Sequence, residues 1–222
     1  MKTRKIPKSA DNNRSGKSVN RRFILVGNHL CVDFANTVYD PNDPAGTLRS
    51  WNDLVDFLEA AGVANRSEAT WLRALGVQGP GACAEAFIKA LSLRDSLRNV
   101  LTAIEARGDI PANWIEEINA VLQAGEGYEQ LVSTKTGWRL LFIPRFEEPL
   151  RVLVSVARSA AKLIEEGAAA PIRKCGNPNC VLYFYDVSPT LRRRWCSMEI
   201  CGNRMKVAAY ARRRQKRKRL LK

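Results

Sequence analysis

Four cysteines near the C-terminal end of the sequence form two pairs whose spacing is typical of a zinc site. Cys175 and Cys180 are separated by four residues, fifteen residues follow, and Cys196 and Cys201 are again separated by four. Two close pairs joined by a short connection can bring four thiolates to one tetrahedral ion. The first pair encloses GNPN, which is rich in turn-forming residues. We therefore predict one Zn²⁺ ion held by these four cysteines.

The alternatives for this region are two disulfides or four unrelated buried thiols. The N-terminal segment is basic and polar, with no apolar stretch like that of a secretory signal. This favours a cytoplasmic protein with reduced cysteines, and an Arg-rich segment of about 50 residues has too little apolar surface to fold without a metal. His29, the one histidine, lies far away in sequence. We therefore expect closed coordination and a structural role for the zinc.

The net charge of +14 is distributed unevenly along the 222 residues. Residues 1–22 carry eight basic side chains and one acidic one, and residues 173–222 carry fifteen basic and two acidic ones. Residues 23–172 carry thirteen basic and nineteen acidic side chains and are therefore mildly acidic. This asymmetry indicates that a polyanion binds the ends of the chain and not its middle.

A basic helix is predicted from Met205 to Arg219, where good helix formers occur without glycine or proline. We expect Val207, Ala208 and Ala211 to dock on the cysteine module. Arginines on such a helix can contact guanine and phosphates in a DNA groove, whereas a solvated basic tail is the alternative. The residues expected to contact nucleic acid are Arg192, Arg193, Arg194, Arg204, Lys206, Arg212, Arg213, Arg214, Lys216 and Arg217.

The elements that position this module belong to a mainly α fold with a small β component (α+β). Apolar residues at helical spacing predict helices over 51–61, 67–76, 83–107, 111–122 and 147–166, with Ser50 and Ser67 as caps of the first two. A β-hairpin is expected over 128–143. A strand is expected at 181–186, followed by a helical turn that begins at Ser188-Pro189. We divide the chain into a flexible basic arm (1–22), a helical domain with the hairpin (23–170) and the cysteine module (171–222).

The helical domain contains none of the sequence motifs that commonly carry catalysis. P-loop, GxGxxG, GxSxG and HExxH patterns do not occur in residues 23–172, so we do not expect an enzyme. Asp33, Asn36 and Thr37 are polar residues inside an apolar stretch, and such residues either satisfy buried backbone groups or face a pocket. The structural role is favoured, and a ligand pocket would make this domain a sensor.

The cysteine module closely resembles the CGNR zinc-finger family. Cys201 to Arg204 spells CGNR, and the resemblance over about 174–214 also includes Phe184, Asp186, Ser188, Lys206 and the segment Arg194 to Met198. The helical domain is similar to the ABATE domain that commonly precedes this finger, chiefly at Leu30, Asp33, Asn36, Thr37 and Val38. These resemblances imply a bacterial, stress-related transcriptional regulator with a DNA-binding finger. The insert Pro189-Thr190-Leu191 departs from the polar and basic residues expected there.

The leading hypothesis is a DNA-binding transcriptional regulator whose finger and basic helix contact DNA, with the helical domain as a sensor or dimerisation unit. Three alternatives stay open: an RNA-binding zinc protein, an enzyme or ligand-binding body with an attached finger, and a protein-interaction adaptor. A small-molecule effector and a homodimer are compatible with the leading hypothesis. We expect a cytoplasmic, nucleoid-associated protein without a membrane span, because no apolar run is long enough to cross a bilayer.

Overall fold

The structure, a computed structural model, describes residues 22–38, 40, 42–43, 46–134, 137–146 and 148–220, without the side chains of 134, 168 and 216–220. The predicted basic arm, apart from Arg22, lies outside the described residues. The helices are α1 (Leu30–Ala35), α2 (Trp51–Ala60), α3 (Arg66–Gln78), α4 (Pro80–Glu105), α5 (Ala112–Gln123), η1 (Pro149–Leu153), α6 (Val154–Glu165), η2 (Gly167–Ala169), η3 (Met198–Gly202) and α7 (Asn203–Leu220). The strands are β1 (Gly127–Thr134), β2 (Gly137–Pro144), β3 (Ile172–Lys174) and β4 (Tyr183–Tyr185). The prediction of a mainly helical α+β fold is confirmed.

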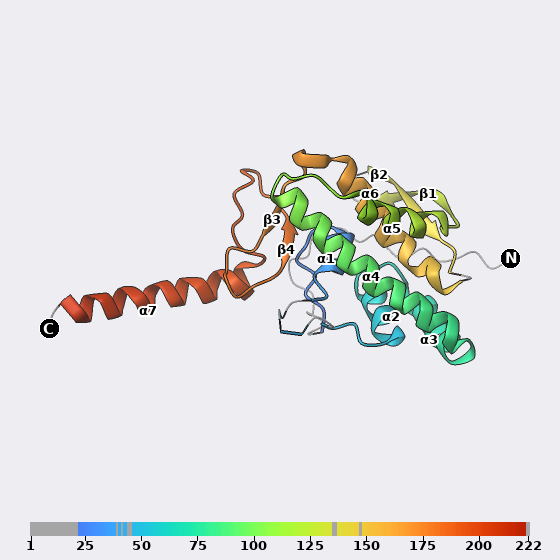
Figure 1. Cartoon of the computed structure of the whole chain (residues 1–222), viewed down its shortest axis with the longest axis horizontal. Helices are drawn as coiled ribbons and strands as arrows, with labels where there is room; N and C mark the ends of the chain where they lie inside the picture. Colours follow the sequence, from blue (N-terminus) through green and yellow to red (C-terminus); the bar gives the residue numbers. More distant parts are fainter. Residues whose placement is uncertain are drawn as a thin grey trace.

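Helix α4 is the axis of the N-terminal region, and α1, α2, α3, α5 and η1 all pack against it (Figure 1). Its buried positions recur every three to four residues, which produces one continuous apolar face. Helix α6 covers α1 and α5 and completes the core. The buried side chains of α4 are Cys83, Ala86, Ala90, Leu93, Arg94, Ser96, Leu97, Val100, Leu101 and Ile104.

Some predicted helix ends were right and others were wrong. Helix α2 is capped by the Ser50 side chain, as expected, and Gly62 follows it with a φ of +75°. Helix α3 begins after Asn65 and not at Ser67, because Asn65 and Glu68 form a reciprocal capping box. Helix α4 starts at Pro80, earlier than predicted. The helix expected from 147 begins instead as the 3₁₀ turn η1, and residue 147 lies outside the described part of the chain.

The predicted hairpin is confirmed as strands β1 and β2, which pair antiparallel from Gly127↔Pro144 to Thr134↔Gly137. Its connection at 135–136 lies outside the described residues. One face of the hairpin leaves Leu131, Leu140 and Trp138 exposed, and the Trp138 side chain is 73% exposed. The opposite face buries Val132.

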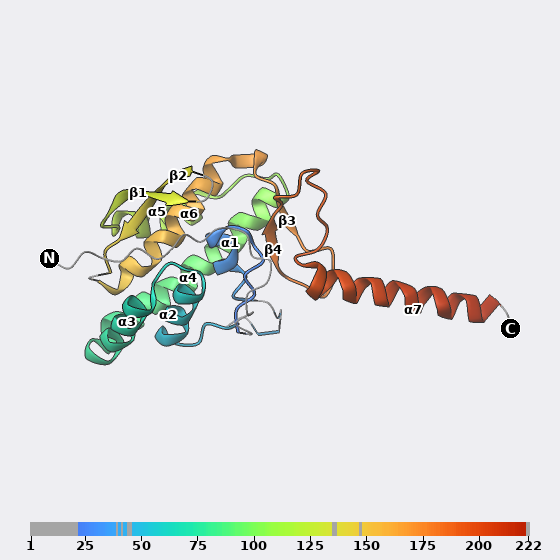
Figure 2. The same ribbon diagram turned by 180° about the vertical axis from the view of Figure 1, so that it is seen from behind.

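The C-terminal region, from β3 to α7, packs on the helical body, which comprises α1 to α6, through a second two-stranded sheet. Strand β3, which the sequence analysis missed, pairs antiparallel with β4, and these strands contact α4 and α1 respectively. Helix α7 projects from the finger and extends away from the body, as both views show (Figures 1 and 2). Across the described part of the chain, no helix has the length and apolar character needed to span a bilayer.

Candidate zinc centre and nucleic-acid interface

The first cysteine pair follows β3 directly and is closed by local backbone hydrogen bonds. The Cys175 amide donates to the Leu182 carbonyl over 2.9 Å, and the Cys180 amide donates to the Asn177 carbonyl over 2.9 Å. The Asn177 side chain accepts a hydrogen bond from the Asn179 amide over 3.1 Å and so tightens the turn. The GNPN sequence thus folds into the sharp turn that its composition predicts.

The second pair is built on a short π-helical turn, η3, that leads into α7. The Ser197 hydroxyl caps this turn by accepting from the Glu199 and Ile200 amides. The Ser197 carbonyl accepts from the Cys201 amide over 3.0 Å. Because α7 begins at Asn203, two residues after Cys201, the direction of α7 is tied to the position of this cysteine.

The four cysteine sulfurs lie within 4.8 Å of one another, and all four residues are buried. The Cys180 and Cys196 Sγ atoms are 3.9 Å apart. A tetrahedral Zn²⁺ with Zn–S bonds of about 2.3 Å needs Sγ–Sγ separations of about 3.8 Å, whereas a disulfide needs about 2.05 Å. All six cysteines of the chain are unpaired. The donor set therefore fits one zinc ion and not a pair of disulfides.

The electrostatics of the four thiols also calls for a cation. The hydrogen bond from the Cys196 thiol lowers the pKa of Cys180 to about 5, and the same contact raises the pKa of Cys196. Burial raises the pKa of Cys175. Crowded thiolates repel one another, so a divalent cation is needed before all four can ionise. Two N–H groups already point at the sulfurs: Asn177 Nδ2 lies 3.4 Å from Cys201 Sγ, and the Cys196 amide lies 3.4 Å from Cys175 Sγ.

The small core around the cysteines is completed by residues from the other end of the chain. Leu182 and Phe184 are buried with the four cysteines, and Ile24 and Val26 pack against them. The Tyr185 amide donates to the Gly27 carbonyl over 2.8 Å, so the segment before α1 runs beside β4. A Cβ atom at Gly27 would lie 2.9 Å from the Asp33 amide nitrogen, so a side chain there would clash with α1. The finger thus depends on residues 24–27 for its packing.

Of the three polar residues singled out in the sequence, Asn36 and Thr37 have structural roles and Asp33 also lines a cavity. Asn36 accepts from the Tyr183 amide over 2.9 Å and donates to the Tyr183 carbonyl over 2.8 Å, which holds β4 as a neighbouring strand would. The Thr37 hydroxyl donates to the Phe34 carbonyl over 2.7 Å. Asp33 accepts from the Gly27 amide over 2.7 Å and also lines a cavity. Asn36 and Thr37 therefore satisfy backbone groups, and Asp33 alone among the three reaches a cavity.

The three consecutive arginines of the finger have different environments. Arg192 is exposed, and Arg194 lies over the Trp195 ring with its guanidinium 4.6 Å from the ring centre. Arg193 is half-buried: Nε donates to the Trp195 carbonyl over 2.9 Å, and Nη2 donates to the carbonyls of Cys196 and, over 3.2 Å, Val26. Arg193 therefore bridges the finger and the body, and its expected contact with nucleic acid stays a prediction.

Helix α7 carries nine basic side chains and no acidic one among its eighteen residues. Arg204, Lys206, Arg212, Arg213 and Arg214 are exposed, whereas the side chains of Lys216 and Arg217 lie outside the described part. The predicted docking of Val207 and Ala211 on the finger is wrong, because both are exposed and Val207 is 67% exposed. Among the described elements, α7 packs mainly on η3, and most of its described side chains are exposed and free to contact a partner.

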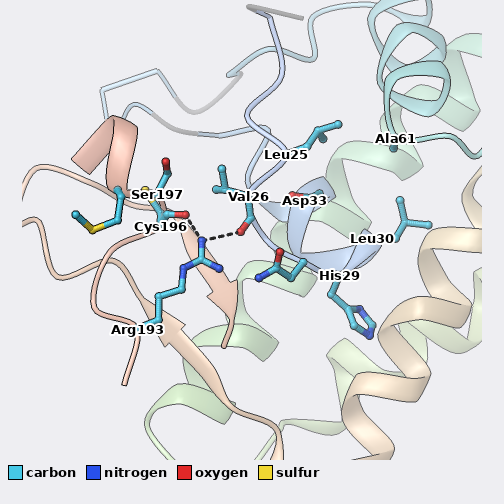
Figure 3. A pocket seen from close by; sticks show the side chains of 11 residues that line it. Leu25, Val26, His29, Leu30, Asp33, Ala61, Arg193, Cys196 and Ser197 are labelled. Atoms are coloured by element: carbon cyan, nitrogen blue, oxygen red, sulfur yellow. Dashed lines mark hydrogen bonds between the residues drawn. The ribbon is translucent and has the colours of Figure 1, made fainter. Parts of the chain in front are cut away.

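A cavity of about 380 Å³ lies between the body and the finger (Figure 3). Leu25, Leu30 and Ala61 form apolar walls on the body side, and Arg193 and Met198 face them from the finger. His29 also lines this cavity and stacks on the Tyr185 ring at 5.8 Å. The Ser159 hydroxyl lies 2.8 Å from His29 Nδ1, and burial lowers the pKa of His29.

Sequence reasoning did not assign a role to several residues that support the site. Ser197 carried a usable signal, since serine before Met-Glu-Ile is a common way to begin a helical turn. Asn177 carried another, since asparagine is frequent in turns. No local signal marked Ile24, Val26 or Arg173, because their roles arise from contacts about 150 residues away or across the finger.

Comparison with known families matches both regions of the chain, in the order predicted. Residues 28–167 match the ABATE family, described as "Putative stress-induced transcription regulator", and residues 172–214 match the CGNR zinc finger. No curated protein matches the chain. The close approach of four buried thiols agrees with a finger that holds one zinc ion. The ABATE match covers more than half of the sequence, and the chain therefore belongs to the ABATE family and carries a CGNR zinc finger at its C-terminal end.

Proposed function

We propose that the protein is a transcription regulator that binds duplex DNA through its zinc finger and helix α7, with Zn²⁺ held by Cys175, Cys180, Cys196 and Cys201. The observation that carries this proposal is α7: a helix of eighteen residues, half of them basic, that extends from the finger away from the body (Figure 1). The acidic body and the family match to a transcription regulator support the same function.

The physical chemistry of α7 favours a polyanionic partner. Like charges three and four residues apart destabilise an isolated helix, so neutralisation by phosphates would stabilise α7. Eighteen residues extend over about 27 Å at 1.5 Å per residue, which is about four-fifths of the roughly 34 Å turn of B-DNA. Arginines can contact guanine through two hydrogen bonds, and the remaining cations can contact phosphates. In this proposal the zinc performs no chemistry and fixes the direction in which α7 leaves the finger.

Competition binding tests this proposal against the RNA alternative. The full-length, zinc-loaded protein is titrated with a labelled mixed-sequence duplex and challenged with unlabelled duplex DNA, structured RNA and single strands. We expect duplex DNA to compete best and crosslinking across a bacterial genome to yield sharp peaks. Preferential competition by structured RNA would replace DNA with RNA as the partner. Absence of binding to any nucleic acid at low salt would contradict the proposal.

A sensor role for the body is supported by the cavity between body and finger. Its lining combines apolar walls with Arg193 and Asp33, which suits a small amphipathic effector. Because Arg193 bridges Val26 and Cys196, a ligand that displaces it would loosen the finger from the body. Ala61→Phe fills the cavity from the body side. We expect this variant to bind DNA normally and to lose thermal stabilisation by any metabolite that stabilises the wild type, whereas equal stabilisation of both would place the effector elsewhere.

Three expectations from the sequence stay predictions: that the chain is not an enzyme, that it is cytoplasmic and nucleoid-associated, and that it forms a homodimer. A dimer would place two α7 helices on one DNA site and lengthen the sequence that is recognised. Light scattering of the full-length protein at two concentrations, with and without duplex DNA, measures the oligomeric state directly.

A further inference from the structure

The loop that follows β4 exposes apolar side chains at one end of the finger. Val187 is 60% exposed and Leu191 is 48% exposed, and Pro189 between them is also exposed. The core of the finger is completed by Ile24 and Val26, which lie far away in sequence. The apolar side chains of this loop are closer in sequence, yet they stay exposed to solvent. The loop includes the insert Pro189-Thr190-Leu191, which departs from the polar and basic residues expected of the family.

Hydrogen bonds from the buried Asp186 carboxylate and from Arg173 fix the backbone of this loop. The Asp186 side chain is 0% exposed, and its carboxylate accepts from the Ser188 amide over 3.0 Å, the Ser188 hydroxyl over 2.6 Å and the Arg193 amide over 2.9 Å. The Leu191 amide donates to the Ser188 carbonyl over 2.9 Å. Arg173 Nη2 donates to the Leu191 carbonyl over 2.7 Å. These bonds form a single rigid turn in place of the helical turn that Ser188-Pro189 predicted.

Leu191 adopts a left-handed backbone conformation, with φ at +48°. Leucine rarely adopts this conformation, and glycine or asparagine would adopt it with less strain. Strain of this kind persists where the surroundings enforce it, and it is concentrated at functional sites. The loop therefore holds the apolar Leu191 side chain at a fixed position, because its backbone is not flexible.

The charges around the loop match a nucleic-acid backbone. Arg192 is exposed directly after Leu191, and Arg173 is exposed beside the loop, where it bonds to the Leu191 carbonyl. The one acidic residue here, Asp186, is buried with Arg173 Nε 3.5 Å away. Figures 1 and 2 show that the finger loops and α7 leave the body at the same end of the molecule. An apolar tip flanked by cations, next to a basic helix, fits a duplex better than it fits an apolar protein surface.

We propose that the rigid loop Val187–Leu191 is an apolar wedge that enters the minor groove of duplex DNA and partly unstacks one base step, while Arg173 and Arg192 contact the flanking phosphates. This inference rests on the proposed function and adds a second contact to that of α7. Leucine and proline side chains inserted between base steps bend DNA by about 20–90°. Flexible pyrimidine–purine steps such as TA are the easiest to open.

The test measures DNA bending and unstacking separately from binding. The probe is a mixed-sequence duplex with a central TA step, labelled at both ends for energy transfer or carrying 2-aminopurine at that step. Leu191→Asn removes the apolar side chain and retains a residue that tolerates the left-handed backbone. Val187→Thr, nearly the same shape, is a second variant that does not depend on the conformation of residue 191. Zinc content and circular dichroism confirm that each variant is folded.

We expect the wild-type protein to shorten the end-to-end distance and to raise 2-aminopurine fluorescence. We expect Leu191→Asn to lose both signals and to bind about tenfold more weakly with an unchanged salt dependence. Val187→Thr is expected to weaken both signals. Wild-type binding without bending, or equal bending by both variants, would overturn the wedge and leave the proposed function standing. Absence of any binding to the duplex at low salt would overturn the proposed function together with the wedge.

Discussion

The helical body and the zinc finger are stabilised in different ways. The body encloses a continuous apolar core that extends from Phe23 through α4 to α6. The finger encloses four cysteines, Leu182 and Phe184, and completes this small core with Ile24 and Val26 from the opposite end of the chain. We therefore expect apolar burial to fold the body, and we expect the finger to need both a metal ion and the packing of residues 24–27.

The same comparison explains how the two regions are joined. Asn36 pairs with both backbone groups of Tyr183, and the Thr102 hydroxyl lies 2.8 Å from the Tyr183 hydroxyl. Tyr183 and Ile172 belong to the core of the body, although they lie on the strands of the finger. The finger is therefore fixed to the body along β3 and β4, whereas α7 extends away from the body (Figure 1).

The largest expected effect follows removal of zinc. Structural zinc contributes about 10–16 kcal/mol of apparent binding free energy in small fingers. A chelator or Cys196→Ser should therefore unfold the finger while the helices of the body persist, as NMR spectra of the two regions would show. Cys83→Ser is the matched control, because Cys83 is buried in α4 away from the cluster. Loss of zinc from the control, or an ordered finger in the metal-free protein, would remove the contrast between the two regions.

The next largest effect is expected within the core of the body. Phe34 is fully buried on α1 and packs on Phe57 with ring centres 5.3 Å apart. Phe34→Ala should lower the free energy of unfolding by about 3–5 kcal/mol, measured by urea denaturation, because it leaves a cavity. A loss below about 1 kcal/mol would mean that α1 is not part of the folding core.

A smaller effect is expected at the junction of body and finger. Asn36→Ala leaves both backbone groups of Tyr183 without their partner, which costs about 1–3 kcal/mol for a buried group. Hydrogen exchange should become faster at β4 and around the cysteines than in α4 and α5. The exposed Asn42→Ala serves as control, since Asn42 bonds locally to Asp40. Unchanged exchange at β4 would show that the finger holds its position without Asn36.

Parts of this structure were predictable because their signals are local. The cysteine spacing, the Ser50 cap and the two short runs of the hairpin each act within a few residues, and the cysteine cluster, the start of α2 and the strand pairing agree with them. The start of α3 was misplaced because two local signals compete there, and the reciprocal box of Asn65 and Glu68 prevails over Ser67. Local signals thus identify an element more reliably than they fix its ends.

Other parts could not be predicted because they depend on distant contacts. Strand β3 has three residues, two of them exposed and charged, and its pairing with β4 defines it. Arg193 has the same side chain as Arg192 and Arg194, and the carbonyl of Val26, 167 residues away, helps to distinguish it. The apolar residues of α7 do not gather on one face, which argues against the docking that was predicted for them.

The smallest effect on stability, and the largest on binding, is expected in α7. Arg212→Gln, Arg213→Gln and Arg214→Gln together should leave the free energy of unfolding within about 0.5 kcal/mol, because these side chains are exposed. The most direct test of the central claim is the salt dependence of duplex DNA affinity for this triple variant and the wild type. If the wild type neutralises about six phosphates, log K should fall with log salt at a slope of about −5, and the variant should have a slope of about −3. An affinity of the wild type that does not change with salt, or equal slopes for the two proteins, would contradict the account.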